Sequence, residues 1–423
     1  MSYKYGPQTN IEFLAQKLLW RWVPKWHGAF CDPHSGFFHE RLNRNFKVMD
    51  MPHRRLLTQC RQMAMYAHAA KARGDLKFLP DLRMSFDALV ELYHVEETGG
   101  WRFSVDRAGK PLDGTYDLYA HAFVLFALCH YAQATGDERA RGLALSTLSF
   151  IDRHFRAGAG FHEALDENLS PKPAMRRHES HMHLLEACLF CAKVWDDPAF
   201  ESMADEIVHL FFTYFYDADK NALSEYFTDD LNPMAKDGHI VQEPGHYGEW
   251  IWLLKKHAAH KDDPKRYDDV CAKMLTWANA AGWDVEFGGI YDELNADGAV
   301  IADTKRLWPF AEILKANALM LDSGMDRDEI KGAIARMVRV FADKYMDDRG
   351  FWTEWLHRDL SPATDYMPGT TPYHVYFGIM EAREILRARG ESVSIIAAPI
   401  RWSYAVRRKM SDAVKRVRRG LKF

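Results

Sequence analysis

The sequence lacks several features that would assign it to a common class of protein. Its 423 residues carry 55 Lys and Arg against 59 Asp and Glu, so the net charge is only −4 and the whole chain is not an obvious nucleic-acid binder. No run approaches the roughly 18 apolar residues that a membrane-spanning helix needs, and the N-terminus has no hydrophobic segment. We therefore expect a soluble, cytoplasmic protein with no membrane span.

Cofactor motifs are missing as well. The six cysteines are scattered, and the only C-x-x-C, Cys188 to Cys191, lies in an apolar helical run where buried thiols are commoner than a redox or zinc site. No G-x-x-x-x-G-K-[ST] or G-x-G-x-x-G opens a helix, and no H-E-x-x-H occurs. The sequence therefore implies no nucleotide cofactor and, from its spacing, no metal.

What the sequence has is a repeat. Short phrases made of a turn, an aromatic or apolar residue and polar residues begin at Gly36, Gly100, Gly160, Leu223, Gly289 and Gly350. The steps between them are about 64, 60, 63, 66 and 61 residues. A unit of roughly 63 residues holds one loop or tiny hairpin and two ordinary helices. Six such units predict twelve helices in one large domain.

Apolar residues at three- and four-residue spacing support this prediction. The expected helices are 11–26, 54–72, 76–93, 116–134, 140–155, 177–195, 200–215, 247–260, 267–281, 308–321, 327–345 and 373–389. Strand signals are confined to the short loops, so the fold class is all-α. The second helix of each unit is the more apolar one, which predicts that it lies inside. The repeat leaves open whether the six hairpins form a spiral or a ring.

The last segment breaks the pattern. Residues 399–423 contain nine Lys and Arg against a single acid, Asp412. This composition suits either a site for an anionic partner or a solvated terminal helix or tail. We therefore expect a catalytic domain over 1–398 and a separate basic segment over 399–423.

Polar side chains recur at one position of the repeat. Counted from the loop phrase, five polar side chains follow after about 23 to 25 residues, near the start of five inner helices. They are Arg61, His183, His246, Glu312 and His374. The remaining unit has Phe123 there, with Tyr119 one turn earlier. Because equivalent positions cluster around the axis of a six-fold arrangement, and burying so many polar groups is costly, we expect a shared functional pocket.

The sharpest local motif is Pro-Gly-His-Tyr-Gly-Glu-Trp at 244–250. His246 and Glu249 are three residues apart and therefore lie on one helical face. A carboxylate at that spacing can bond an imidazole nitrogen and raise its basicity, so we expect Glu249 to orient His246 as a general base. His374, which opens another inner helix, is the natural second acid–base group.

Two other chemistries use the same residues. His183, His246, His374 and Glu249 would suit zinc or manganese, and Glu249 with Glu312 could form a glycosidase pair. Converging histidines fit proton transfer better than glycoside cleavage, where they would have no clear task. Both alternatives stay open at this point.

Five segments resemble the N-acylglucosamine 2-epimerase superfamily, which includes cellobiose 2-epimerases and mannose-type aldose–ketose isomerases. They are 60–63 (Cys-Arg-Gln-Met), 180–187 (Ser-His-Met-His-Leu-Leu-Glu-Ala), 244–250, 308–312 (Trp-Pro-Phe-Ala-Glu) and 372–374 (Pro-Tyr-His). They occur in family order over most of the chain. The resemblance implies a closed (α/α)6 barrel and metal-free proton transfer through a cis-enediol(ate), with no cofactor.

The resemblance also implies roles for single residues. His246 and His374 become the acid–base pair, Glu249 orients His246, and Arg61 stabilises the oxyanion. The substrate-binding candidates are His183 (a sugar hydroxyl or ring opening), Trp308 and Glu312 (pocket shape), Glu179 and Lys236 (sugar specificity), and Tyr119.

Two catalytic hypotheses follow, and both have a small sugar as the partner. The first is an aldose–ketose isomerase of the mannose–fructose type, which the segment 177–184 favours. The second is a 2-epimerase acting on N-acetylglucosamine or on a β-linked disaccharide such as cellobiose. A non-catalytic sugar-binding or protein-interaction role is the third reading, against which the intact His246, Glu249 and His374 speak. A homodimer is possible, and no nucleic acid is expected.

Overall fold

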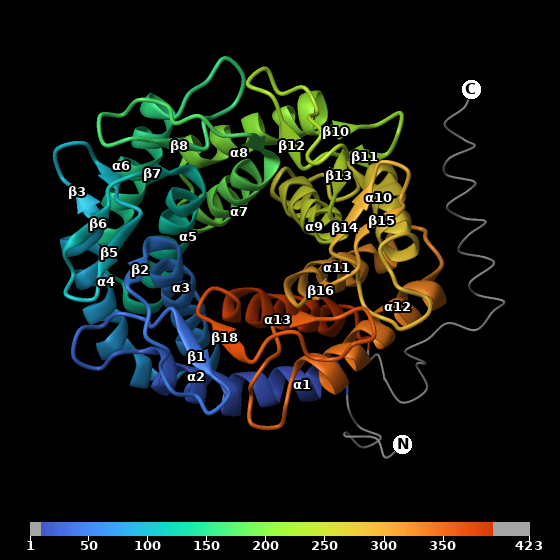
Figure 1. Ribbon diagram of the computed structural model, residues 1–423, viewed down its shortest axis with the longest axis horizontal. Coiled ribbons are helices and arrows are strands. Elements are labelled where there is room, and N and C mark those ends of the chain that lie inside the picture. Colours follow the sequence, from blue (N-terminus) through green and yellow to red (C-terminus); the bar gives the residue numbers. More distant parts are fainter. Residues whose placement is uncertain (1–9, 392–423) are drawn as a thin grey trace.

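The computed structural model describes residues 10–391, which form a helix-rich, all-α fold (Figure 1). The basic segment 399–423 and the end of the predicted 1–398 domain lie outside the described residues. Within 10–391, no helix combines the length and apolarity needed to cross a bilayer.

Six inner helices surround the centre of the molecule (Figure 1). They are α3 (Leu56–Arg73), α5 (Leu118–Thr135), α7 (His178–Trp195), α9 (Pro244–His260), α11 (Trp308–Leu319) and α13 (Pro372–Ala388). Each contacts the next inner helix along the chain, and α13 contacts α3. The two ends of the described chain therefore meet, and α1 also packs on α13.

The outer helices alternate with the inner ones along the chain. They are α1 (Ile11–Lys17), α2 (Val23–Phe30), α4 (Leu79–Tyr93), α6 (Arg139–His154), α8 (Pro198–Leu210), α10 (Asp268–Ala280) and α12 (Arg327–Val340). Short π-helical turns, η1 (Leu18–Trp22), η3 (Phe211–Phe215) and η5 (Phe341–Tyr345), join α1 to α2 or extend α8 and α12, and the 3-10 turns are η2 (Leu76–Phe78) and η4 (Met320–Asp322).

The apolar pattern explains which helix lies inside. In α5 every residue from Ala120 to Tyr131 is buried, as expected for a helix that is apolar on all sides. In α6, by contrast, polar and apolar residues alternate at helical spacing and only one face is buried. The prediction that the second helix of each unit lies inside is confirmed (Figure 1).

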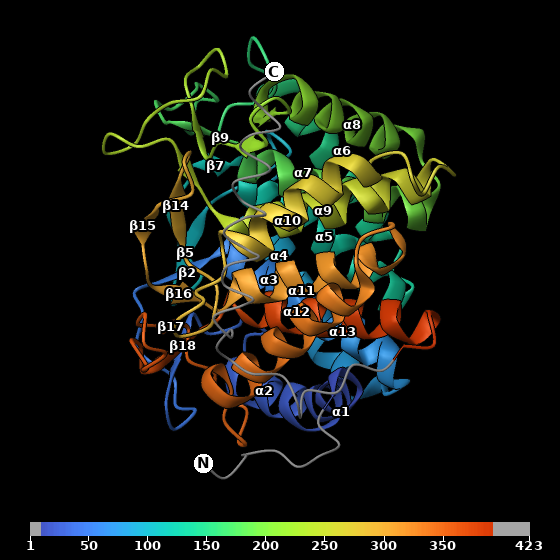
Figure 2. The ribbon, with the colours of Figure 1, turned by 90° about the vertical axis from the view of Figure 1, so that its right-hand side faces the viewer.

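The strands lie together at one end of the helices (Figure 2), and all pairs are antiparallel. The strand that precedes each inner helix pairs with the strand that follows the loop phrase of the next unit. These pairs are β2 (His53–Arg55) with β5 (Ser104–Asp106), β7 (Tyr116–Asp117) with β8 (Ala164–Leu165), β9 (Arg176–Arg177) with β12 (Tyr226–Phe227), β13 (Val241–Gln242) with β14 (Glu293–Asn295), β16 (Lys305–Arg306) with β17 (Trp355–Leu356), and β18 (Tyr366–Pro368) with β1 (Arg41–Asn43). The last pair joins unit six to unit one.

The remaining strands extend or precede these pairs. They are β6 (Pro111–Asp113) beside β5, β15 (Val300–Ala302) beside β14, β3 (His94–Val95) with β4 (Gly100–Trp101), and β10 (Tyr216–Asp217) with β11 (Ala222–Leu223). The expectation of tiny hairpins at the loop phrases is confirmed where β4 and β11 return along β3 and β10. Every inner helix begins at the strand-bearing end of the molecule.

Two glycines let α11 approach both of its inner neighbours closely. A Cβ on Gly248 of α9 would lie 2.7 Å from the backbone nitrogen of Ile313, and one on Gly378 of α13 would lie 2.5 Å from the Cβ of Ala311. No larger side chain fits at either position without moving a helix. This close packing brings Glu312 of α11 within reach of α13.

Candidate active site

Most of the predicted site residues line one cavity of about 440 Å³ at the strand-bearing end of the inner helices. Of the ten, the lining includes Arg61, Tyr119, Glu179, His183, Lys236, His246, Glu249, Trp308 and His374. The tenth, Glu312, lies directly behind the lining and bonds His374. Residues from six units of the repeat therefore meet in one place.

A repeated carboxylate attaches the loop phrases to the inner helices. Glu40, Glu163 and Glu225 each accept the backbone N–H of a residue that precedes an inner helix, and each also accepts a hydrogen bond from the side chain three residues later. The acceptor–donor sets are Glu40 with Arg55 N and Thr58 Oγ1, Glu163 with Arg177 N and Ser180 Oγ, and Glu225 with Glu243 N and His246 Nδ1. These bonds satisfy donors at the helix start that have no partner within the helix.

This pattern corrects the predicted phase of His246. His246 occupies the position of Thr58 and Ser180, one turn closer to the mouth than Arg61 and His183. The true counterpart of Arg61 and His183 in the fourth unit is Glu249. The count from the loop phrase misplaced His246 because the loop between Glu225 and α9 is longer than in the other units.

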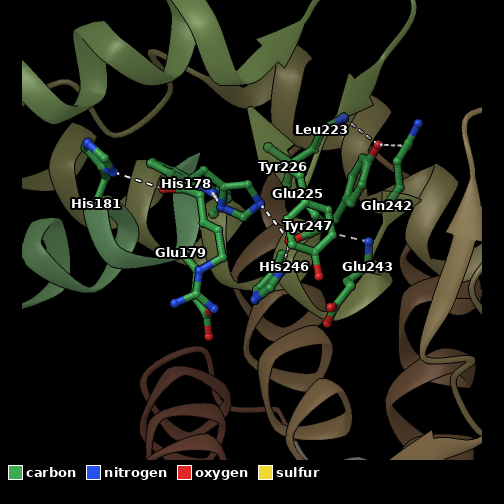
Figure 3. A network of polar contacts seen from close by, with 12 residues as sticks. His178, Glu179, His181, Leu223, Glu225, Tyr226, Gln242, Glu243, His246 and Tyr247 are labelled. Atoms are coloured by element: carbon green, nitrogen blue, oxygen red, sulfur yellow. Dashed lines mark hydrogen bonds and ion pairs between the residues drawn. The ribbon is translucent and has the colours of Figure 1, made fainter. Parts of the chain in front are cut away.

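The predicted partner of His246 is wrong as well. His246 Nδ1 lies 2.8 Å from Glu225 Oε2, and Glu225 also faces His178 at 3.2 Å (Figure 3). Glu249 turns toward His183. The Oε1 atom of Glu249 lies 3.7 Å from Nδ1 of His183 and has no hydrogen-bond partner among the described residues. Burial and the neighbouring carboxylates raise the pKa of Glu249 well above its ordinary value. Glu225 therefore orients His246, and Glu249 is a buried acid that keeps its proton.

Glu225 determines the charge of His246. Burial alone would lower the pKa of His246, but the adjacent Glu225 carboxylate overcomes this and raises it to about 10. Burial would in turn raise the pKa of Glu225, and His246 with His178 holds it below its ordinary value. His246 is therefore an imidazolium at neutral pH, and its Nε2 is the nitrogen left for the cavity.

His374 is in the opposite state. Its Nδ1 lies 3.0 Å from Glu312 Oε1, while Lys315 Nζ lies 2.6 Å from Glu312 Oε2. Burial lowers the pKa of His374 to about 3, since the Glu312 bond does not offset it and the Arg61 charge lowers it further. His374 is therefore neutral, and the Glu312 bond at Nδ1 leaves Nε2 as a proton acceptor.

His183 has the same kind of support. Its Nδ1 lies 3.1 Å from Glu186 Oε2, and the Tyr373 hydroxyl donates to the same carboxylate. Burial lowers the pKa of His183, so this ring is neutral as well. All three histidines thus use Nδ1 on a carboxylate, which fixes their orientation.

Arg61 is a buried cation with no carboxylate partner among residues 10–391. Its guanidinium donates to the Tyr119 hydroxyl and lies 4.3 Å from the centre of the Phe123 ring and 5.0 Å from that of Tyr373. Its Nε is buried and has no partner among the described groups. A buried guanidinium surrounded by aromatic rings is prepared for an anionic ligand.

The other predicted residues form the walls. The Trp308 ring lies 4.7 Å from His246 and 5.9 Å from His374, measured between ring centres. Glu179 pairs with Arg177 at 2.9 Å. Lys236, on the loop after β12, donates to the Tyr226 hydroxyl at 3.0 Å. These groups are close enough to the two histidines to contact a ligand held between them.

Two groups near the cavity have donors that could hold a metal ion. They are His178, Glu225 and His246, and His183, Glu186 and Glu249, with ligand atoms within 4.8 Å of one another. In each group a carboxylate already accepts a hydrogen bond from an imidazole Nδ1, so the histidine is satisfied without a cation. The absence of a metal stays a prediction.

Sequence reasoning missed Glu225, Glu186 and Lys315. Glu225 had a signal, because it belongs to the loop phrase and matches Glu40 and Glu163 in phase. Glu186 and Lys315 had a signal too, because each is a charged residue three positions beyond a predicted site residue and therefore on the same helical face.

Comparison with known proteins agrees with this geometry. The family model described as N-acylglucosamine 2-epimerase (GlcNAc 2-epimerase) matches residues 36–378. A mannose-6-phosphate isomerase of Rhizobium meliloti (strain 1021) is 28% identical over 86% of this chain and 94% of that protein. A cellobiose 2-epimerase of Bacteroides fragilis is 25% identical over 69% of this chain and 76% of its own length. The crystal structure of a D-mannose isomerase has the same fold, with a TM-score of 0.81, 19% identity, and coverage of 90% of this chain and 100% of that one.

Proposed function

The chain belongs to the N-acylglucosamine 2-epimerase family and is a sugar isomerase or epimerase, and from that premise we propose that it converts a mannose-type aldose into the ketose (mannose to fructose). One observation carries the proposal: His246 and His374 line the same cavity from different helices, and each has Nδ1 on a buried carboxylate. Their surroundings shift the two pKa values in opposite directions, to about 10 and about 3. Environments that push two pKa values apart are typical of an acid–base pair.

The reaction begins with the open-chain sugar between His246 and His374. Neutral His374 takes the proton from carbon 2 through Nε2, and the electron pair moves into the carbonyl to give a cis-enediolate. Arg61, which has no counter-ion among the described residues, stabilises the negative oxygen. The His246 imidazolium donates its proton to the former carbonyl oxygen and then takes the hydroxyl proton from the oxygen on carbon 2, so that it ends as an imidazolium again. His374 returns the proton that it took to carbon 1, which gives the ketose and leaves His374 neutral.

The remaining site residues have binding roles in this proposal. His183 binds a sugar hydroxyl or assists ring opening, Trp308 and Glu312 shape the pocket, and Tyr119 holds Arg61. Glu179 and Lys236 lie at the mouth of the cavity and contact the end of the sugar that is away from the reacting carbons. Glu249, as a neutral acid, donates a hydrogen bond to the substrate rather than orienting His246.

The unpaired cations of the cavity favour an unphosphorylated sugar. Its lining contains six glutamates and four Lys or Arg side chains: Glu179, Glu225, Glu243, Glu249, Glu293 and Glu354, with Arg61, Arg177, Lys236 and Arg306. Arg177 and Arg306 are already paired, with Glu179 at 2.9 Å and Glu243 at 2.6 Å, and the His246 imidazolium is paired with Glu225. Because Arg61 is needed at the enediolate, a phosphate dianion would find Lys236 as its unpaired cation in this lining, although one relative is a mannose-6-phosphate isomerase.

A 2-epimerase acting on N-acetylglucosamine or cellobiose is the second candidate. Its support is that His246 and His374 come from different helices, α9 and α13, and that a cellobiose 2-epimerase is among the relatives. Epimerisation needs the same enediolate, but the proton returns to carbon 2 from the opposite face. The two reactions therefore differ only in where the proton is returned.

A proton NMR time course in deuterium oxide separates the candidates. The panel contains mannose, mannose 6-phosphate, N-acetylglucosamine and cellobiose. We expect fructose from mannose and slower turnover of the phosphate ester. Deuterium at carbon 2 of an epimer with no ketose would instead identify a 2-epimerase, and no turnover or exchange of any sugar would refute both.

The closed (α/α)6 barrel and the domain limits are proposals of the same kind. Contact of α13 with α3 and pairing of β18 with β1 support ring closure. The family match over 36–378 supports one catalytic domain within 1–398. The homodimer and the cytoplasmic location stay predictions.

A further inference from the structure

A second cavity lies at the other end of the inner helices, away from the strands. Its volume is about 420 Å³, and side chains of α3, α5, α7, α9 and α13 line it. Most of them come from the later turns of these helices, whereas the active-site residues come from the first turns. Of its lining residues, Glu186 is the one that supports the proposed isomerase site, as the carboxylate that holds His183.

Aromatic rings form its walls. Phe126, Phe190 and Phe377 face the cavity together with the imidazole of His130, which is stacked on Phe190 at 4.0 Å between ring centres. Burial holds the pKa of His130 well below its ordinary value, so this ring is neutral. Aromatic walls of this kind favour an aromatic ligand, which can make edge-to-face and offset-stacked contacts with them.

Two buried polar atoms in the lining have no hydrogen-bond partner among residues 10–391. They are Nε1 of Trp252, whose residue is 8% exposed, and Nε2 of His130, whose residue is 3% exposed. Buried polar groups nearly always have a partner. An indole N–H can only donate a hydrogen bond, so a ligand that satisfies Trp252 must carry an acceptor atom.

The charges point to an anionic group. Glu381 is paired with Lys256 at 2.7 Å, and Glu186 is occupied by Tyr373 and His183. Lys193 lines the cavity, is exposed, and has no ion pair within the described part of the chain. Lys193, at the rim, is therefore the cation that can pair with a bound anion, while the walls of the cavity are apolar.

From these contacts we propose that this cavity is a second ligand site that takes a planar aromatic carboxylate of one or two rings. The ligand rings lie against the aromatic walls, an acceptor oxygen receives the Trp252 N–H, and the carboxylate faces Lys193. This site is separate from the sugar cavity, but one of its lining residues contacts a side chain that holds the active-site groups in place. Lys315 Nζ lies 3.7 Å from the centre of the Trp252 ring and 2.6 Å from Glu312, the carboxylate that holds His374. The ligand therefore acts as an effector of turnover.

Binding is tested with indole-3-carboxylate by isothermal titration, without sugar, so that the result does not depend on the proposed isomerase activity. Indole is the control without a negative charge, and cyclohexanecarboxylate is the control without a planar ring. We expect both to bind at least about 10-fold more weakly than indole-3-carboxylate. Equal affinity for cyclohexanecarboxylate, or no binding of any probe up to about 10 mM, would overturn the proposal.

Variants locate the bound probe. Trp252→Phe keeps an aromatic ring and removes the N–H, and we expect about 10-fold weaker binding. Lys193→Gln should weaken the carboxylate probe and leave indole unchanged. Trp195→Phe, on the same helix as Lys193 but outside the lining, is the matched control and should bind like wild type. Unchanged affinity in Trp252→Phe, or competition of the probe with the turned-over sugar, would refute the assignment to this cavity.

If Trp252→Phe does not fold, as its melting curve will show, Phe190→Ala replaces it and should abolish binding. With saturating probe, we expect kcat to change at least about twofold while KM for the sugar stays constant. A bound probe with no effect on kcat would refute the effector role.

Discussion

His246 and His374 make the same contact, but His246 is charged and His374 is neutral. Each places Nδ1 on a buried carboxylate at about hydrogen-bond distance, 2.8 Å to Glu225 and 3.0 Å to Glu312. Yet the pKa of one rises to about 10 and that of the other falls to about 3. A histidine–carboxylate pair alone therefore does not determine whether the ring is charged.

The difference lies in the other neighbours of each carboxylate. The second contact of Glu225 is His178, whose pKa burial lowers, so that ring is neutral and the Glu225 charge remains for His246. Glu312 shares its charge with Lys315 at 2.6 Å. The charges around each ring differ as well: Glu243 and Glu179 also raise the pKa of His246, whereas Arg61 lowers that of His374, where burial prevails.

The largest expected effect comes from removing either histidine. His374→Asn should lower turnover about 10²–10⁴-fold, because the proton acceptor is lost. It should also abolish exchange of the carbon 2 proton with deuterium oxide, measured by NMR. His246→Asn is the comparison and should lower turnover while keeping some exchange. Wild-type exchange in His374→Asn would reverse the two roles.

Glu225→Gln tests what keeps His246 charged. The amide can still accept the Glu243 N–H but carries no charge to hold a cation, so the pKa of His246 should fall from about 10 toward the ordinary value of a histidine. A reaction that needs the protonated ring then loses activity as the pH rises through this lower pKa. At pH 8 we expect kcat/KM to fall about 10- to 100-fold, with partial recovery near pH 6.

The control for that variant is Glu163→Gln. Glu163 makes the same backbone contact in the third unit but faces Ser180 in place of a histidine. Its variant should lose some thermal stability and keep the wild-type pH profile. A similar shift of the pH profile in both variants would show that the loss of the carboxylate contact at the helix start, and not the charge of His246, is responsible.

Glu312→Gln should have a smaller and different effect. His374 is already neutral, so removing a group that raises its pKa leaves it neutral across the usual assay range. We expect a loss of about 3- to 10-fold in kcat from poorer orientation, with both limbs of the pH profile unmoved. A shift of the profile between pH 6 and 9 would contradict the neutral assignment of His374.

The smallest catalytic effect is expected from Gly378→Ala. The added Cβ would lie 2.5 Å from the Cβ of Ala311 and would push α11, which carries Glu312, away from α13. The free energy of unfolding should fall by about 1–3 kcal/mol, with only a small loss of turnover. Gly142→Ala, in α6 with open space around the new Cβ, should be neutral or stabilising by up to about 1 kcal/mol. Denaturant melts of both variants check this.

The sequence predicted the helices and the meeting of distant residues, because periodicity and repeat phase are properties of spacing. Arg61, His183 and His374 were found at one phase for that reason. It could not predict the partner of His246, because Glu225 is joined to it through a loop whose length differs from that of the other units. The neutral state of His374 could not be predicted either, since it depends on burial and on the nearby Arg61, which comes from another helix and which only packing brings close.

The capping carboxylates of the loop phrases have a consequence for protein engineering. In the third unit Ser180 stands where the fourth unit has His246, with Glu163 Oε2 2.6 Å from its hydroxyl. Thr58 stands there in the first unit, 2.8 Å from Glu40 Oε2. Equivalent carboxylates therefore stand at three places around one rim, and replacing Ser180 with histidine would give Glu163 an imidazole partner like the one that Glu225 has in His246.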